Sequence, residues 1–122
     1  QRRQRAALAP FGLTHSQFVV LAAAAWFGAD EVLTQARLAE VTEVDPMSTS
    51  QLVRTLEAAK LLARADHPTD ARANAITVSA AGAKKAKAAI VAVEDADEAF
   101  FAPLGKDARA LVLAFRQLLA AD

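Results

Sequence analysis

Apolar and polar positions recur with a helical period in the middle of the chain, between Asp45 and Glu57. Apolar or half-apolar side chains fall on one face at i, i+3, i+4 and i+7, namely Thr49, Leu52, Val53 and Leu56. Asp45 suits the N-cap, because its carboxylate can accept hydrogen bonds from the unpaired N–H groups of the first turn. Pro46 suits the first helical position, where its missing N–H costs nothing. The pattern therefore predicts a short amphipathic helix.

The opposite face of this helix has an unusual composition. A solvated face usually carries Glu and Lys, whereas this one carries small hydroxyls, an amide and a guanidinium: Met47, Ser50, Gln51 and Arg54. These groups suit base edges and phosphates in the major groove of DNA. Taken by itself, the segment is better explained as an ordinary surface helix, so the flanking segments decide between the two interpretations.

The N-terminal part of the chain predicts two helices. Residues 2–9 are expected to form the end of a helix that a proline and a glycine then break. Thr14 and Gln17 have capping-box spacing, in which each side chain satisfies the other's backbone N–H, and they predict a helix to about Phe27. Its expected buried stripe consists of Phe18, Leu21, Ala22 and Ala25.

A helix-turn-helix followed by a hairpin is predicted next. Thr34 is expected to cap a short helix over residues 35–41, and a tight connection leads from it to Asp45. Residues 62–66 and 75–78 then have the short, partly alternating pattern of strands, separated by a turn-rich loop. Two short helices and a two-stranded hairpin are the plan of a winged helix-turn-helix.

The C-terminal part predicts two more helices. Ser79 is expected to cap a long helix over residues 80–102, and residues 107–119 form the last one. Many large apolar residues gather near this end of the chain: Phe100, Phe101, Leu104, Leu111, Val112, Phe115, Leu118 and Leu119. Such an apolar surface favours a dimer interface over a purely intramolecular core.

Composition narrows the class of protein. The chain has 122 residues, of which 54% are hydrophobic, enough for one folded domain. Its 4 glycines and 4 prolines disfavour an all-β fold, and the absence of cysteine excludes disulfides and thiol metal sites. No apolar run is long and pure enough to span a membrane, and no signal peptide is expected, so the pattern fits a cytoplasmic protein.

The net charge of +0 counts against a simple nucleic-acid binder, but its distribution matters more. Basic residues fall in the middle of the chain: Arg54, Arg64, Arg72, Lys84, Lys85 and Lys87. An acidic block follows over residues 94–98, so the long helix carries its charges against its own dipole. This arrangement makes sense if the basic end approaches phosphates and the acidic end stays remote.

In order along nearly its whole length, the chain resembles the MarR family of bacterial winged-helix transcription factors. The resemblance rests on Leu13-Thr14 with Gln17 and Leu21, on Leu38-Ala39, on residues 45–64, on Asp70-Ala71-Arg72-Ala73, and on Val78-Ser79 with Gly82. It implies one domain over residues 1–122, made of N-terminal helices (1–30), a winged helix-turn-helix core (31–79) and dimerisation helices (80–122). One departure is Lys60, which stands where the family usually has a glycine with left-handed geometry.

The resemblance also assigns roles to residues. Those expected to contact DNA are Met47, Ser48, Ser50, Gln51, Arg54, Arg64, His67, Asp70 and Arg72. Arg72 is expected in the minor groove, whose negative potential attracts arginine, with Asp70 orienting the wing by pairing with an arginine. An effector pocket for a small aromatic or anionic ligand is expected at Phe11, His15, Phe18 and Trp26, although an aromatic core cluster explains these residues as well.

We therefore expect a homodimeric, ligand-responsive repressor that binds a pseudo-palindromic operator with half-sites about 10 bp apart. Two histidines are too few for a metal site, and no nucleophile–base pair or phosphate-binding loop is present, so neither a cofactor nor enzymatic activity is expected. The alternative is a winged-helix module for protein interaction without DNA binding. Net neutrality supports that alternative, whereas the Asp70–Arg72 wing and the polar helix face oppose it.

Overall fold

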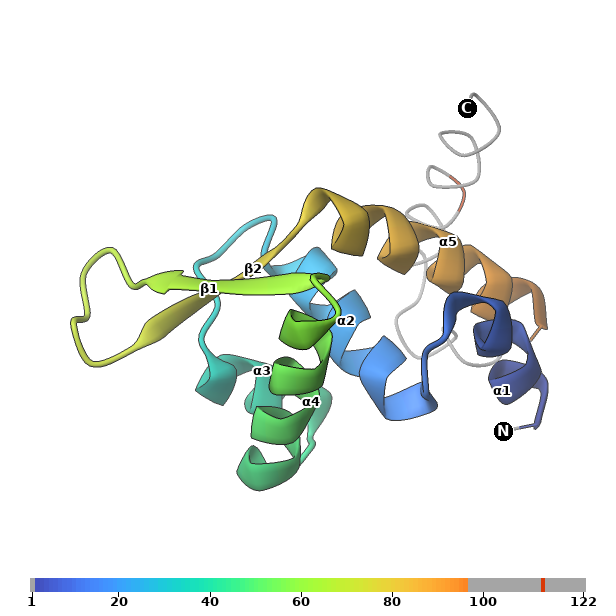
Figure 1. Cartoon of the computed structure of the whole chain (residues 1–122), viewed down its shortest axis with the longest axis horizontal. Helices are drawn as coiled ribbons and strands as arrows, with labels where there is room; N and C mark the ends of the chain where they lie inside the picture. The colour runs from blue at the N-terminus through green and yellow to red at the C-terminus, as the bar shows by residue number, and fades with distance from the viewer. Residues whose placement is uncertain (1, 97–112, 114–122) are drawn as a thin grey trace.

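The computed structural model describes residues 2–96 and residue 113. Its elements, in order, are α1 (Arg2–Leu8), the 3-10 helix η1 (Ala9–Phe11), α2 (His15–Phe27), α3 (Gln35–Thr42), α4 (Pro46–Ala58), β1 (Leu62–Asp66), β2 (Asn74–Val78) and α5 (Ala80–Ala96). The predicted fold class, mainly α with a two-stranded wing, is confirmed (Figure 1). The predicted end of the long helix (97–102), the predicted last helix except residue 113, and the apolar residues of the expected dimer surface lie outside the described residues.

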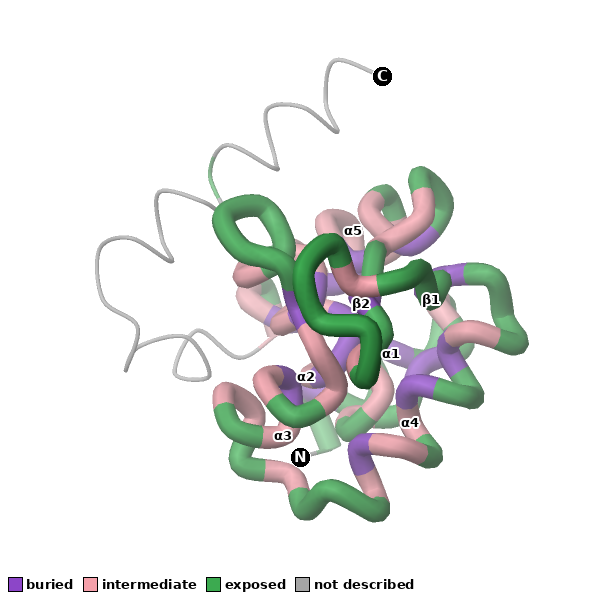
Figure 2. Tube along the Cα trace, turned by 90° about the vertical axis from the view of Figure 1, so that its left-hand side faces the viewer, coloured by how far each residue is buried: buried purple, intermediate pink, exposed green. Residues whose placement is uncertain are grey.

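Helix α2 is the centre of the packing. It contacts α1, α3, α4, α5 and β2, and Figure 2 shows that much of its length is buried or half-buried. The prediction of its buried stripe was half wrong: Phe18 and Leu21 are buried, but Ala22 and Ala25 are only half-buried. The other fully buried positions are Val20 and Ala24. A helix surrounded on several sides has no single apolar face, so periodicity could not identify these positions.

The capping box predicted at the start of α2 is confirmed. The Thr14 hydroxyl accepts a hydrogen bond from the Gln17 backbone N–H (3.1 Å), and the Gln17 side chain accepts one from the Thr14 N–H (3.0 Å).

Among residues 2–96, no single helix is long and apolar enough to cross a membrane. The bent pair Arg2–Phe11 and His15–Phe27 is long and apolar enough only when its two parts are taken together.

The wing is an antiparallel hairpin whose register runs from Leu62 opposite Val78 to Asp66 opposite Asn74. Both strands lie where the sequence predicts them. An isolated bridge joins Leu33 to Ile76 on the outer side of β2, where the Ile76 N–H donates to the Leu33 carbonyl at 2.8 Å. A single paired residue has no periodic signature, so the sequence does not reveal this bridge. It ties the segment before α3 to the wing.

Helix α4 ends in a tight left-handed turn. Lys60 has φ of 64°, its N–H donates to the Glu57 carbonyl (2.9 Å), and the Leu61 N–H donates to the Leu56 carbonyl (2.9 Å). These two bonds form a Schellman motif, which satisfies carbonyls that the end of a helix leaves unpaired. Lys60 therefore adopts the geometry usual for glycine, despite the cost of placing a side chain there.

The start of α5 packs on the residue that follows this turn. The Leu61 carbonyl accepts from the Ser79 N–H (3.1 Å), and the Ser79 hydroxyl lies 2.7 Å from the Lys60 carbonyl oxygen and 3.2 Å from that of Leu61. The same hydroxyl accepts from the Gly82 N–H at 2.9 Å, which confirms Ser79 as the helix cap. A Cβ at Gly82 would overlap the Leu61 carbonyl oxygen and lie 2.9 Å from its carbon. The close contact between position 82 and the Leu61 backbone therefore requires a residue without a side chain.

The close packing at Gly82 predicts that alanine at this position destabilises the protein, whereas helix propensity predicts the opposite. Alanine favours a helix by about 1 kcal/mol over glycine, but the added Cβ must displace backbone at Leu61. Overpacking of this kind costs about 1–3 kcal/mol, so we expect Gly82→Ala to lower the free energy of unfolding, measured by urea denaturation. The control is Ala81→Gly at the exposed neighbouring position, which should cost about 1 kcal/mol by propensity alone. A Gly82→Ala protein at least as stable as the parent would contradict the packing argument.

The left-handed turn makes a second prediction. Because Lys60 has φ of 64°, replacing it by glycine should remove strain and raise the free energy of unfolding by about 1 kcal/mol. The matched control is Ala59→Gly, since Ala59 has φ of −79° and is not strained. That change should destabilise the protein. Thermal melting of both variants beside the parent tests the difference. Equal shifts of the melting temperature in the two variants would show that Lys60 is not strained.

Candidate nucleic-acid interface

The outward face of α4 is polar and accessible. Met47 is 75% exposed, and Gln51 and Arg54 are exposed, while Ser48 and Ser50 are half-buried. On the inner face the buried residues are Thr49, Val53 and Leu56. The two faces predicted from the periodicity are thus confirmed as faces. The exposed face offers an amide and a guanidinium to a partner, the side chains that pair with adenine and guanine edges.

The turn before α4 sets the orientation of this face. Glu43 ends α3 in the left-handed conformation, with φ of 58°. Thr49, which is fully buried, lies with its hydroxyl 2.9 Å from the Asp45 carbonyl oxygen and 3.3 Å from that of Val44. Asp45 caps α4 by accepting from the Ser48 N–H (2.9 Å). The hydroxyl and backbone N–H of Ser48 hold the pKa of the Asp45 carboxyl below its usual value.

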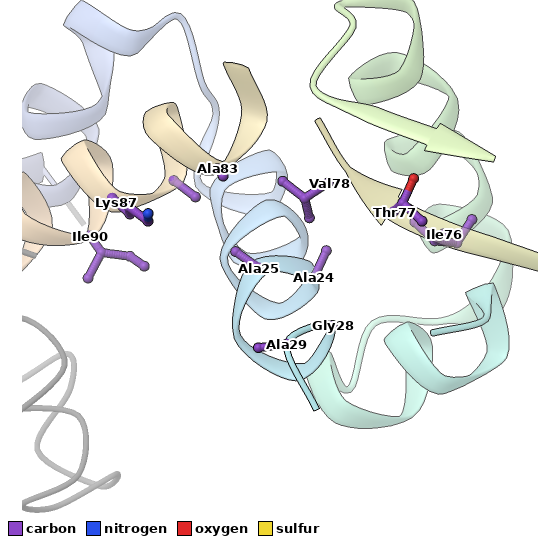
Figure 3. Close-up of a pocket in the computed structure, with 11 residues that line it drawn as sticks. Ala24, Ala25, Gly28, Ala29, Ile76, Thr77, Val78, Ala83, Lys87 and Ile90 are labelled. Carbon is purple, nitrogen blue, oxygen red and sulfur yellow. The ribbon is translucent and has the colours of Figure 1, made fainter. Parts of the chain in front are cut away.

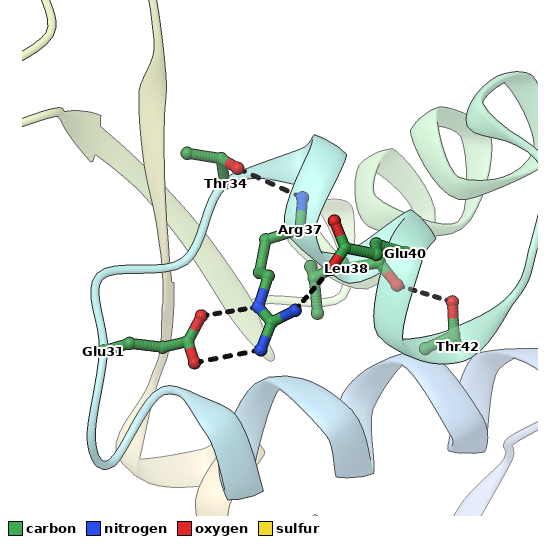
Figure 4. A network of polar contacts seen from close by, with 6 residues as sticks. All are labelled: Glu31, Thr34, Arg37, Leu38, Glu40 and Thr42. Atoms are coloured by element: carbon green, nitrogen blue, oxygen red, sulfur yellow. Dashed lines mark hydrogen bonds and ion pairs between the residues drawn. The ribbon is translucent and has the colours of Figure 1, made fainter.

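A polar network that was not predicted anchors the start of α3 (Figure 4). The Arg37 guanidinium binds both carboxylate oxygens of Glu31 (2.8 and 3.4 Å) and one of Glu40 (2.6 Å). Arg37 also lies 5.5 Å from the ring centroid of Phe27. The hydrogen bond that Arg37 donates to Glu31 is the main cause of the raised pKa of Arg37. The i,i+3 spacing of Arg37 and Glu40 could have indicated one half of this network; the Glu31 contact crosses a loop and has no such spacing.

The wing loop between β1 and β2 carries three of the predicted residues and corrects one prediction. Asp70 does not form an ion pair with an arginine among the described residues; its Oδ1 accepts from the Arg72 backbone N–H at 3.0 Å. His67 Nδ1 accepts from the backbone N–H groups of Thr69 (3.2 Å) and Asp70 (3.0 Å). Asp70 and Arg72 are exposed, whereas His67 is half-buried. The Arg72 guanidinium therefore takes part in no ion pair within the described residues.

Two other basic residues are bound to the protein itself. Arg64 Nε donates to Glu57 Oε1 at 3.2 Å, joining β1 to α4. Lys85, one of three lysines near the start of α5, donates from its Nζ to the Phe11 carbonyl at 3.0 Å and joins α5 to η1. The Lys85 ammonium is therefore held by a partly buried carbonyl at the end of η1 and is not simply solvated. A DNA contact by Arg64 stays a prediction. One of its N–H donors, at Nε, already binds Glu57.

A cavity of about 330 Å³ lies between α2, β2 and α5 (Figure 3). Its walls are apolar apart from Thr77 and Lys87; the apolar lining comprises Ala24, Ala25, Gly28, Ala29, Ile76, Val78, Ala83, Ala86 and Ile90. The cavity wall was not predicted, since it draws residues from three elements. The pattern of alanines in α2 and α5 was the available signal.

The four residues proposed for an effector pocket do not line this cavity. Phe18 is fully buried in the core, Phe11 and His15 are half-buried, and Trp26 is 37% exposed. An effector role for them stays a prediction. Within residues 2–96 and 113, no three His, Asp or Glu side chains are grouped as a metal site would require.

Comparison with known proteins identifies this arrangement. A model of the MarR family matches residues 11–73. The uncharacterised helix-turn-helix transcriptional regulator YdcH of Bacillus subtilis is 40% identical over 103 residues, which cover 84% of this chain and 70% of that protein.

Two solved structures show the same fold. MarR from E. coli in its apo form superposes with a TM-score of 0.71 at 21% identity, covering 97% of this chain and 86% of that one. CouR from Rhodococcus jostii, bound to p-coumaroyl-CoA, has a TM-score of 0.71 at 28% identity, covering 96% and 78%. The family match spans α2, the helix-turn-helix and most of the wing, and the relative extends it over most of the chain. The chain belongs to the MarR family of transcriptional regulators.

Proposed function

We propose that this protein is a sequence-specific, double-stranded DNA-binding repressor that acts as a homodimer on a pseudo-palindromic operator. The observation that carries the proposal is the polar outer face of α4, with Gln51 and Arg54 exposed, followed directly by an exposed wing that carries Arg72. Figure 1 shows the β1–β2 loop projecting beyond the helices. A helix of this kind fits the major groove, and a projecting arginine fits the adjacent minor groove. Such a regulator works in the cytoplasm, where bacterial DNA is.

Binding of a small effector is the second part of the proposal. The cavity of about 330 Å³ is at the lower end of the range for small-molecule sites, about 300–1,000 Å³. Lys87, in a lining whose other residues are apolar except Thr77, suits an anionic ligand with an apolar body. CouR, whose structure contains p-coumaroyl-CoA, supports ligand binding within this family. Ligand would shift DNA affinity only if it binds two states of the protein unequally.

The runner-up is a winged-helix module for protein interaction without DNA binding. A net charge of +0 supports it, because non-specific DNA affinity comes from phosphate contacts. The exposed polar face of α4 is less useful to such a module, and so is the charge of Arg72, which has no ion-pair partner among the described residues. Substitutions at Gln51 and Arg72 distinguish the two functions.

Gln51 tests whether α4 reads bases. Because its side chain is exposed on the outer face of α4, Gln51→Ala should relax sequence preference while leaving affinity for random DNA nearly intact. A good bidentate base contact discriminates by about 1–3 kcal/mol. The measurement is the ratio of affinities for the upstream intergenic DNA and a mixed-sequence duplex, at fixed salt. Thr55→Ala, one turn along the exposed side of α4, is the control; an unchanged ratio in Gln51→Ala would exclude Gln51 from the reading residues.

Arg72 tests the wing. Arg72→Ala should weaken binding to operator and random DNA together, because its charge acts on the backbone potential. The slope of log affinity against log salt should fall by about one unit for each phosphate that a subunit no longer touches. The fold should survive, since Arg72 is exposed and makes no ion pair within the described residues. Affinity and slope that both stay at the parent values would remove the wing from the DNA contact and favour the protein-interaction alternative.

A further inference from the structure

The wing loop is shaped by two side chains that act on its backbone. His67 Nδ1 accepts from the N–H groups of Thr69 (3.2 Å) and Asp70 (3.0 Å), and Asp70 Oδ1 accepts from the N–H of Arg72 (3.0 Å). Two backbone hydrogen bonds close the loop around them: His67 N–H to the Ala73 carbonyl (3.4 Å) and Ala73 N–H to the Asp70 carbonyl (3.2 Å). The contacts form a series that runs from His67 through Asp70 to Arg72.

The chemistry of imidazole decides which atom of His67 is committed to the protein. A ring nitrogen accepts a hydrogen bond only when it carries no proton, so two N–H donors at Nδ1 require the neutral tautomer with the proton on Nε2. Nδ1 thus replaces the carboxylate or amide oxygen that usually holds such a turn through the backbone two or three residues later. His67 is half-buried while Asp70 and Arg72 are exposed, which fits a residue beneath the loop.

We propose that His67 is a positioning residue for Arg72, and that it acts through Nδ1 and Asp70 instead of contacting DNA itself. His67 fixes the Asp70 backbone, and Asp70 fixes the Arg72 backbone, so the guanidinium is presented from a defined loop and not from a flexible one. Ordering the loop before binding lowers the entropy cost of forming the complex. This proposal rests on the proposed function, since it assumes that Arg72 contacts DNA.

Two isosteric substitutions distinguish positioning from direct contact. Asparagine places its side-chain oxygen at the same distance along the side chain as Nδ1, so His67→Asn keeps an acceptor for the Thr69 and Asp70 N–H groups. Glutamine extends one bond further and places its amide near Nε2, so His67→Gln keeps a possible DNA-facing group but loses the acceptor. His67→Ala removes both.

The experiment compares the whole chain with these three variants by fluorescence anisotropy on a fluorescein-labelled, mixed-sequence duplex at low salt. We expect His67→Ala and His67→Gln to weaken binding about fivefold, the effect of removing one or two hydrogen bonds. His67→Asn should stay within about twofold of the parent. Rescue by Gln but not by Asn would overturn the proposal in favour of a direct contact through Nε2, and full affinity in His67→Ala would overturn any role.

A double variant separates failure of this proposal from failure of the proposed function. If His67 acts through Arg72, then His67→Ala with Arg72→Ala should bind no more weakly than Arg72→Ala alone, because the two changes are coupled. Additive losses would show that His67 acts by another route, while DNA binding through Arg72 stands. If Arg72→Ala has no effect, the wing contact itself is wrong, and the positioning role falls with it. Thermal melting of each variant confirms that the weaker binding does not come from unfolding.

Discussion

The packing of Gly82 against the Leu61 carbonyl is the constraint on which the position of the wing depends. At this point the end of α4, both ends of the hairpin and the start of α5 meet within a few residues. The Leu61 carbonyl accepts from the Ser79 backbone, and the Ser79 hydroxyl joins the Lys60 turn to the first turn of α5. Gly82 has no side chain and therefore allows the two backbones to approach closely. As a result, the base of the wing cannot move without moving α4 and α5.

This constraint connects the parts of the proposed function. The cavity is lined by Val78 from the base of the wing and by Ala83 from the first turn of α5, on either side of the Gly82–Leu61 contact. A ligand in this cavity would lie next to the contact between Gly82 and Leu61, which fixes the angle between the wing and α5. Because packed interfaces adopt discrete arrangements, a ligand that prefers one of them would change the position of the wing relative to α4 without touching α4.

The fold was predictable wherever the signal was local. The caps at Thr14, Asp45 and Ser79 were predicted from short motifs, since each depends on a side chain and an N–H within three residues. The Leu33–Ile76 bridge and the Arg37–Glu31 pair were not predictable, because each joins segments brought together only by folding. For the site, exposure of the α4 face followed from its period, whereas the roles of charged and ring side chains did not follow from residue type: the same wing sequence fitted a DNA-contacting histidine and a structural one.

Neutral net charge takes a different meaning once the partners of the basic residues are known. Arg37 is neutralised by Glu31 and Glu40, Arg64 is paired with Glu57, and Lys85 is bound to a backbone carbonyl. Arg54 and Arg72 take part in no ion pair among the described residues, and both lie on exposed parts of the proposed interface. Part of the positive charge therefore stabilises the fold, and the net charge of +0 gives little attraction to DNA over a distance. With a weak general attraction, affinity must come from a few well-placed contacts, which is why the geometry of the wing loop matters more here than it would in a strongly basic protein.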